Sequence, residues 1–300
     1  MPGDLVGCAV RVSAPATSAN LGPGFDHLGL AFELRQSATL RVIDGPSTAE
    51  VTGEGADAVP RDGSHLIIRS AVAALADLGV RVPGLALTAD NVIPHGRGLG
   101  SSAAAIVAGL VAGAALAGAD PDPDRVLRQA VAIEGHADNV AAALYGGLVI
   151  VVGEPDRLTV APVEPHPDLA AEVYVPDVAL STTHARGLLP EVVPHRDAAA
   201  TAGRAALLVE AVSRTPELLL EATVDRLHQP YRGPAMPASH ELLESLRSKG
   251  YPAVISGAGP TVLVLGRSAD LTELPDRAGF RRHRLRIGSG ARVDHAAATP

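Results

Sequence analysis

The feature that most constrains the fold of this chain is an uncharged stretch that begins at Gly98 and ends at Ala119. The stretch is long enough to span a bilayer. Alanine, glycine and serine make up most of it, however, and these residues gain little from transfer into lipid. Its larger side chains share one face of a helix, and they are Ile106, Val107, Leu110 and Val111. The pattern therefore favours a helix buried in a globular protein over a membrane span.

The composition supports a globular protein and argues against two classes of partner. Hydrophobic residues make up 47% of the 300 residues and charged residues 19%, enough to bury a sizeable core in one large or two moderate domains. The net charge of −8 does not supply the basic face that nucleic-acid binding uses. The single cysteine, Cys8, fits a reducing compartment, and the first residues lack a basic segment followed by an apolar one. We therefore expect a cytoplasmic protein with no nucleic-acid or membrane partner.

Hydrophobic patterns and turn residues predict a mixture of helices and strands. Helices are predicted at 64–78, 101–117, 122–134 and 137–144, and further ones near 197–213, 216–227 and 239–249. Strands are predicted at 8–13, 38–43, 85–92, 148–152, 172–175, 253–255 and 261–265. The arginine-rich run 281–284 is expected in an exposed strand or loop. The irregular order predicts an α+β fold, and a proline-rich segment predicts a boundary between domains 1–160 and 161–300.

A glycine- and serine-rich loop at Pro94–Ala105 carries the strongest chemical signal. Three glycines within five positions, at 96, 98 and 100, let the backbone approach a bulky anion and adopt positive φ angles. A helix follows at once, so its free N–H groups and its positive dipole end face the loop. Ser101 and Ser102 lie in the first turn, where one hydroxyl can bind a phosphate and the other Mg²⁺. The loop therefore predicts a site for nucleotide phosphates.

A Walker A loop and a dinucleotide-binding turn both fit this segment less well. A Walker A loop requires Gly-Lys-Ser/Thr, and the single lysine of the chain, Lys249, lies far away. The spacing Gly98-x-Gly100-x-x-Ala103 matches a loose dinucleotide fingerprint, but the acidic strand end expected about twenty residues later is missing. A glycine-rich turn with a purely structural role remains the alternative to a nucleoside triphosphate site.

Three motifs in order resemble the superfamily of galactokinase, homoserine kinase, mevalonate kinase and phosphomevalonate kinase, the GHMP kinases. The Pro94–Ala105 loop resembles its phosphate-binding motif. The segment Ala14–Asp26 resembles the first motif of the homoserine kinase family in particular, and Ser256–Thr261 resembles the third motif of the superfamily. The resemblance implies the two-domain α+β GHMP-kinase fold, with the active site in the cleft between the domains.

The resemblance also implies an activity and its ligands. It implies transfer of a phosphoryl group from ATP, with Mg²⁺, to L-homoserine, which gives O-phospho-L-homoserine on the way to threonine. It further implies a homodimer. Two alternatives remain: another small-alcohol kinase of the superfamily, for example one acting on mevalonate, and a catalytically inactive sensor that binds the ligands without transfer.

The matching positions imply the following site. ATP is expected to contact the loop residues Pro94, His95, Gly96, Arg97, Gly98, Leu99, Gly100, Ser101, Ser102, Ala103 and Ala104. Ser102 and Glu134 are expected to bind Mg²⁺. The residues expected to contact the acceptor are Asn20, Asp26, His136, Asn139, Thr182, Arg186 and Arg232. Catalytic roles are expected for Asn20, Glu134, Asn139 and Arg186.

The chemistry of a zwitterionic acceptor fits these positions. Asp26 can pair with an ammonium group, Arg186 and Arg232 can hold a carboxylate, and Asn20 can bond the hydroxyl. The chain departs from the family where alanines stand at 137 and 142, since prolines are frequent there. No general base is evident, and the role of Asp138 stays open.

Overall fold

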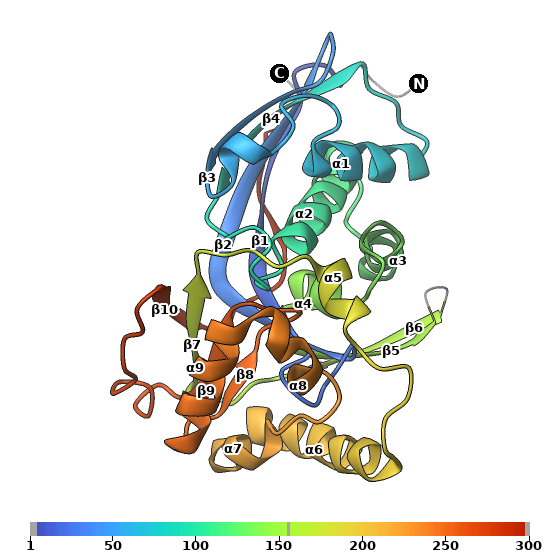
Figure 1. The fold of residues 1–300 in the computed structure, drawn as a ribbon. Helices are drawn as coiled ribbons and strands as arrows, with labels where there is room; N and C mark the ends of the chain where they lie inside the picture. Colours follow the sequence, from blue (N-terminus) through green and yellow to red (C-terminus); the bar gives the residue numbers. More distant parts are fainter. Residues whose placement is uncertain (1–4, 155–156, 298–300) are drawn as a thin grey trace.

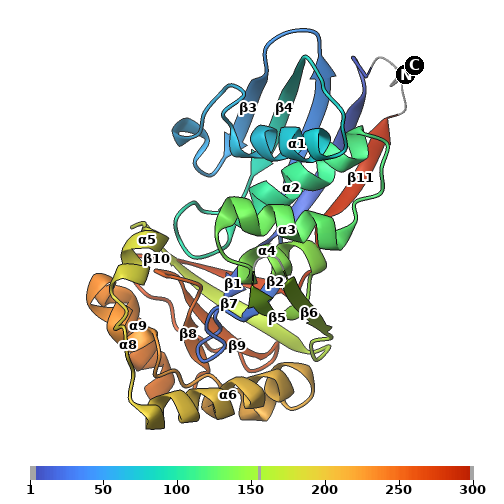
Figure 2. The same cartoon turned by 90° about the vertical axis from the view of Figure 1, so that its right-hand side faces the viewer.

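The computed structural model describes residues 5–154 and 157–297, which form two β-sheets with helices packed against them (Figure 1, Figure 2). The first sheet has the order β11-β1-β2-β4-β3, and β5 joins it by pairing with β2 and β6. Its strands are β1 (Ala9–Ala19), β2 (Leu28–Ile43), β3 (Thr48–Gly53), β4 (Gly84–Asn91), β5 (Leu148–Glu154), β6 (Arg157–Val163) and β11 (Arg292–Ala297). Only β3 and β4 pair in parallel among its described strands.

The second sheet is antiparallel, with the order β10-β7-β9-β8. Its strands are β7 (Leu169–Pro176), β8 (Ala253–Ile255), β9 (Val262–Arg267) and β10 (Phe280–Arg286). The helices of the first half of the chain pack on the first sheet, and they are α1 (Leu66–Asp77), α2 (Ser101–Leu116), α3 (Pro123–Glu134) and α4 (Asp138–Tyr145). The later helices lie with the second sheet, and they are α5 (Thr182–Gly187), α6 (His195–Ser213), α7 (Leu219–Ala222), α8 (Gln229–Arg232) and α9 (Pro237–Ser248).

Helix α2 lies at the centre of the first half of the molecule, between β1, α1, α3 and α4 (Figure 2). The prediction of a buried helix is confirmed, and none of the helices that the structure describes is long and apolar enough to cross a membrane. The helix is buried on nearly all sides, so burial is not confined to the face that carries its larger side chains. Alanine and glycine occupy the remaining faces, and their small size lets the neighbouring elements approach closely.

Most predicted elements are present, and the fold class is confirmed. The predicted helix at 216–227 is wrong: a 3₁₀ turn at Pro216–Leu218 and the short α7 are followed by a turn. After this break the Asp225 carboxylate keeps the chain out of a helix, since it accepts hydrogen bonds from the backbone N–H groups of residues 227, 228 and 229 at 2.8, 3.0 and 2.7 Å. The α7 helix has already ended at Ala222, and these bonds hold the turn that leads into α8.

Long-range pairings were not predicted and shape the sheets. β1 and β2 extend well beyond the predicted strands and pair up to Ala19↔Gly29, so that residues 20–27 form the loop that joins them. β11 pairs with β1, which brings the end of the chain back to the first sheet. The arginine-rich run lies in β10, mostly exposed, as expected. The β5–β6 hairpin of the first sheet ends at Val163, and we keep the division near residue 160 as a proposal.

The close approach of α1 and α2 depends on a glycine in α2, and replacing this glycine tests the packing of the two helices. A Cβ atom on Gly109 would overlap the carbonyl oxygen of Ile67 and lie 2.6 Å from the Cβ of Ser70. Gly109→Ala should therefore lower the free energy of unfolding by about 1–3 kcal/mol. Gly203, in α6, has nothing within 4 Å of its Cβ position.

The matched change Gly203→Ala should instead raise the free energy of unfolding by about 0.5–1 kcal/mol, because it removes backbone freedom from the unfolded chain. Urea denaturation of the two variants measures both values. Equal effects of the two substitutions would contradict the packing described for α1 and α2.

Candidate active site

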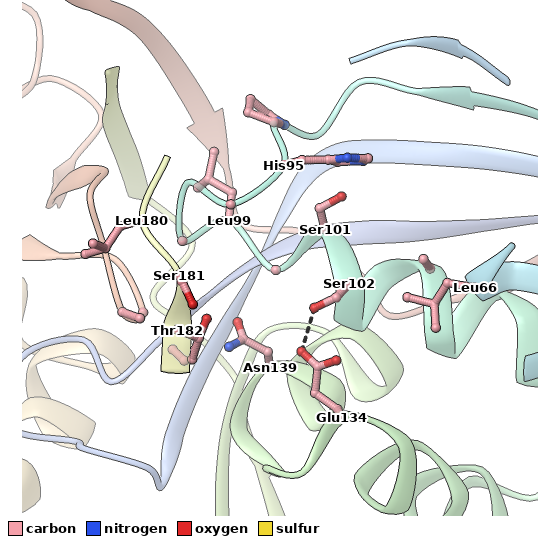
Figure 3. Close-up of a pocket in the computed structure, with 18 of the residues that line it drawn as sticks. Leu66, His95, Leu99, Ser101, Ser102, Glu134, Asn139, Leu180, Ser181 and Thr182 are labelled. Atoms are coloured by element: carbon pink, nitrogen blue, oxygen red, sulfur yellow. Dashed lines mark hydrogen bonds between the residues drawn. The ribbon is translucent and has the colours of Figure 1, made fainter. Parts of the chain in front are cut away.

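A cleft of about 450 Å³ lies between the two sheets and contains the predicted site (Figure 3). The glycine- and serine-rich loop and the start of α2 form its middle. All of the predicted acceptor contacts line it, and they are Asn20, Asp26, His136, Asn139, Thr182, Arg186 and Arg232. The structure thus brings together residues that lie more than two hundred positions apart in the sequence.

The loop before α2 is folded as the sequence predicts. Gly98 and Gly100 have φ angles of 74° and 67°, a region that favours glycine. A Cβ atom on Gly98 would overlap the carbonyl oxygen of Ser256, and one on Gly100 would overlap the Thr17 side chain. Both glycines therefore allow a close approach of backbone segments that place the start of α2 toward the cleft.

Hydrogen bonds join the three motifs around this loop. The Ser256 hydroxyl donates to the carbonyl oxygen of Gly98 at 2.5 Å and lies 2.8 Å from the Ser18 hydroxyl. The backbone N–H of Thr17 donates to the carbonyl oxygen of Leu99 at 3.0 Å. The first, second and third motifs thus form one hydrogen-bonded unit.

Most of the loop residues predicted to contact ATP line the cleft, and they are Pro94, His95, Gly96, Gly98, Leu99, Gly100, Ser101 and Ser102. The side chain of Arg97 instead donates to the carbonyl oxygens of Pro176 and Asp177 in the second half of the chain. The side chains of Ala103 and Ala104 are fully buried in the core. These three positions can therefore serve a nucleotide through the backbone or by supporting the loop.

Ser102 and Glu134 meet at the edge of the cleft. The Ser102 hydroxyl donates to Glu134 Oε1 at 2.6 Å (Figure 3). Burial raises the pKa of Glu134, and the hydrogen bond from Ser102 opposes that shift. A partly buried carboxylate beside a hydroxyl offers the oxygen ligands that Mg²⁺ prefers. The described part of the chain has no cluster of three or more His, Cys, Asp or Glu side chains that could hold a metal ion.

Asp26 and Arg186 form an ion pair at the end of the cleft that carries the predicted acceptor contacts, which we call the acceptor end. Arg186 donates from both terminal nitrogens to the two oxygens of Asp26, at 2.8 and 3.1 Å. Burial lowers the pKa of Arg186, but the hydrogen bonds and charge of Asp26 outweigh that effect and raise it overall. The two side chains predicted to face the opposite ends of a zwitterion therefore face each other here.

Arg232 is the most deeply buried cation at this end, with 1% of its surface exposed. It donates to the carbonyl oxygen of Ala185 at 3.2 Å, to a ring nitrogen of His228 at 3.1 Å and to the carbonyl oxygen of Gly257 at 3.4 Å. Its second terminal nitrogen, Nη2, has no hydrogen-bond partner among the described residues, and Arg232 lines the cleft. Burial, followed by the nearby charge of Arg186, lowers the pKa of Arg232.

The two asparagines of the site have fixed orientations. Asn20 accepts from the backbone N–H of Asp26 at 3.0 Å and donates to the carbonyl oxygen of Gly257 at 2.8 Å. Thr17 donates its hydroxyl hydrogen to Asn139 Oδ1 at 2.8 Å, which leaves the Asn139 amide hydrogens for other partners. Asn139 lies between Glu134 and Thr182 in the view of Figure 3.

Asp138, whose role the sequence left open, is 3% exposed and also lines the cleft. Burial raises its pKa, and Oδ1 accepts from the backbone N–H of Asn139 at 2.7 Å. His136 Nδ1 lies 3.8 Å from that oxygen and is buried without a hydrogen-bond partner in the described residues. The acceptor end therefore carries Asp26, Asp138, Arg186 and Arg232 within one small volume.

The opposite end of the cleft was not predicted. It is lined by side chains from β3, α1, β4 and the loops beside them, including Val51, Leu66, Ala89 and Asn91. In Figure 3, Leu66 and Thr182 lie on opposite sides of the two serines at the start of α2. The mainly apolar character of this end suits the base of a nucleotide. Its residues occur singly in strands and loops, so no local motif marked them.

Comparisons with known proteins agree with this geometry. Residues 65–147 match the family model described as "GHMP kinases N terminal domain", and residues 204–278 match "GHMP kinases C terminal". The chain is 53% identical to the homoserine kinase of Streptomyces avermitilis over 90% of both chains. It is 46% identical to that of Mycolicibacterium vanbaalenii over 95% of this chain and 94% of the relative.

Solved structures show the same fold. The crystal structure of homoserine kinase from Cytophaga hutchinsonii superposes with a TM-score of 0.83 at 28% identity, covering 95% of this chain and 97% of that one. Mevalonate diphosphate decarboxylase from Enterococcus faecalis shares the fold with a TM-score of 0.70 at 13% identity, covering 95% and 98%. On these grounds the chain belongs to the GHMP kinases and, within them, to the homoserine kinase family.

Proposed function

We infer that this protein transfers the γ-phosphoryl group of ATP to the hydroxyl of L-homoserine and releases ADP and O-phospho-L-homoserine. The observation that carries this inference is the charge arrangement beside the phosphate loop. An acid, Asp26, and two arginines, Arg186 and Arg232, line one end of the same cleft as Ser101 and Ser102. A small alcohol with both an ammonium and a carboxylate complements these charges.

The site residues act by positioning and by stabilising charge, which phosphoryl transfer requires more than covalent help. The backbone N–H groups at the start of α2 hold the phosphates, and Ser101 donates to them. Asn139 donates to the acceptor hydroxyl oxygen, while Asn20 keeps the 20–26 loop in place. The alcohol oxygen bonds to the γ-phosphorus, the bond from that phosphorus to the bridging oxygen of ADP breaks, and the alcohol proton passes to an oxygen of the transferred phosphoryl group.

We propose that Mg²⁺ bound by Ser102 and Glu134 belongs to the active site. When bound, the ion neutralises charge on the β- and γ-phosphates. Two protein oxygens completed by phosphates and water suit this ion, which rarely uses a cage made by protein alone. Glu134 and Ser102 already lie within hydrogen-bond distance of each other, so both can turn toward one ion.

We also propose that Asp26 binds the ammonium of the acceptor and that Arg186 and Arg232 bind its carboxylate. His136 and Thr182 line the same end and complete its wall. A cytoplasmic location, a step toward threonine and a homodimer remain predictions that follow from the family.

The first prediction separates this function from its two rivals. With ATP and Mg²⁺, the protein should release ADP at a much higher rate with L-homoserine than with mevalonate, because mevalonate has no ammonium to pair with Asp26. A coupled ADP-release assay over a panel of small alcohols measures these rates. Faster turnover of another alcohol would assign a different kinase, and binding of ATP and homoserine without turnover would indicate a sensor.

The second prediction concerns Glu134. Glu134→Gln keeps the size of the side chain but removes the charge that attracts the metal ion. It should lower kcat by about 100-fold or more, the scale expected when a preorganised contact with the transition state is lost. Titration of activity with Mg²⁺, with circular dichroism as the control for folding, measures the effect. Near-normal turnover of this variant at limiting Mg²⁺ would rule out the metal assignment.

The third prediction concerns the carboxylate of the acceptor. Arg186→Ala should lower kcat/KM for homoserine by roughly ten- to a thousandfold, because the carboxylate loses a charged partner. The same change should leave kcat/KM for 3-aminopropan-1-ol, which lacks the carboxylate, unchanged or higher, since Asp26 is released from its ion pair.

Arg125→Ala is the matched control, because Arg125 forms a surface ion pair with Asp77 and lines no part of the cleft. It should change neither value. An equal loss on both acceptors in Arg186→Ala would place Arg186 with the phosphates or the fold.

A further inference from the structure

A fully buried histidine, His228, lies directly behind the acceptor end of the cleft. It stands between the turn at Asp225 and α8, has 0% of its surface exposed, and does not line the cleft. Its backbone N–H donates to the Asp225 carboxylate, which fixes the position of the backbone that carries the ring. Histidine is seldom buried so completely without a role for its ring nitrogens.

The two ring nitrogens of His228 have partners that determine the tautomer. Nε2 lies 2.9 Å from the carbonyl oxygen of Gly22, which can only accept, so Nε2 carries the hydrogen. Nδ1 lies 3.1 Å from Nη1 of Arg232, a guanidinium nitrogen that can only donate, so Nδ1 carries none. The ring is therefore a neutral imidazole that donates to one segment and accepts from the other.

Through Nε2, His228 holds the loop of residues 20–26. This loop contains three non-glycine residues with positive φ angles, Asn20, Leu21 and Asp26, a conformation that needs support from its surroundings. The Phe25 ring of the same loop stacks on the His228 ring, with centroids 5.1 Å apart and planes 20° apart. The hydrogen bond and the stacked ring together place Asp26 at the cleft.

Through Nδ1, the same ring sets the direction of Arg232. Three donors of the guanidinium are used by Ala185, His228 and Gly257, and the Arg232 Cζ atom lies 5.4 Å from the centroid of the Phe25 ring. This arrangement leaves Nη2 as the terminal nitrogen available to the cleft. Without an acceptor at Nδ1, the guanidinium would lose the contact that fixes this orientation.

We propose that His228 is a positioning residue for the acceptor. As a neutral imidazole it links the 20–26 loop to Arg232, and it thereby fixes the positions of Asp26 and Arg232, the acidic and basic contacts of the substrate, relative to each other. The proposal rests on the proposed function, and it adds a residue that never touches the substrate. The charged groups that face the ring are Asp225 on the preceding turn, Arg232 on α8 and Asp26 on the loop. Burial lowers the pKa of His228, and the charge of Arg232 adds to this effect while Asp225 opposes it.

Steady-state kinetics of three His228 variants tests the proposal. His228→Phe keeps a ring to stack on Phe25 but removes both nitrogens, and it should raise KM for homoserine roughly ten- to a hundredfold, the value of hydrogen bonds to a charged group. KM for ATP should stay within about twofold of the wild type. His228→Asn places an amide oxygen near the position of Nδ1 and should recover the part of the loss that comes from Arg232, whereas His228→Gln reaches the position of Nε2 and should recover the part that comes from the 20–26 loop.

The dependence of KM for homoserine on pH distinguishes this positioning role from a purely structural one. In the wild type, KM for homoserine should rise as the pH falls through the pKa of His228, which lies below the ordinary histidine value of 6.5, because protonated Nδ1 can no longer accept from Arg232. The rise should be absent from His228→Asn. A rise of equal size in His228→Asn would overturn the proposal.

Tyr174→Phe is the matched control for loss of a buried hydrogen bond in the same half of the molecule, since the Tyr174 hydroxyl donates to the carbonyl oxygen of Pro275 at 2.8 Å. It should leave KM for homoserine unchanged.

Equal increases in KM for ATP and homoserine in the His228 variants, or no increase in either, would overturn the proposal. If His228→Phe does not fold, the Asn and Gln variants decide, since a wild-type KM for homoserine in both of them would overturn the proposal. A wild-type protein inactive toward homoserine would instead contradict the proposed function.

Discussion

The active site depends on the contact between the Ser256 hydroxyl and the backbone of Gly98. The hydroxyl donates to the Gly98 carbonyl oxygen at 2.5 Å and lies 2.8 Å from the hydroxyl of Ser18, so one side chain joins three segments that are distant in the sequence. This approach requires glycine at position 98, because a Cβ atom there would overlap the Ser256 carbonyl oxygen. The start of α2 faces the cleft because the first and third motifs hold the loop in this position. The cleft is thus a product of tertiary packing rather than of the loop alone.

At the acceptor end, the charged side chains satisfy one another. Arg186 and Asp26 share two hydrogen bonds, and the buried Arg232 is held by two carbonyl oxygens and an imidazole. A zwitterionic acceptor can replace the pair without leaving either charge uncompensated, since its ammonium meets Asp26 and its carboxylate meets Arg186. A ligand with one charge would leave the other partner unpaired, which is costly in a partly buried site. Selectivity for an amino acid that carries a hydroxyl group follows from this balance.

The sequence predicted the parts of the structure that depend on local patterns. The glycine spacing and the uncharged composition predicted the loop at 94–105 and the buried helix after it, and the family resemblance of several short segments predicted the residues that line the acceptor end. The pairing of β11 with β1 could not be predicted, because strand partners distant in the sequence leave no local pattern. The predicted helix at 216–227 was wrong, since α7 ends at Ala222 and the Asp225 carboxylate holds the turn that follows. The sequence did not indicate a role for His228, because an isolated histidine belongs to no recognisable motif. The proposed role depends on two hydrogen-bond partners that only the fold brings together.

The central claim is that this cleft transfers phosphate from ATP to the hydroxyl of homoserine. Phosphorus NMR of the protein with ATP, Mg²⁺ and L-homoserine observes that event directly. The account predicts a new phosphate monoester signal coupled to the terminal methylene protons of homoserine, in equal amount to the ADP formed. ADP accompanied by inorganic phosphate alone, with no ester signal, would contradict it.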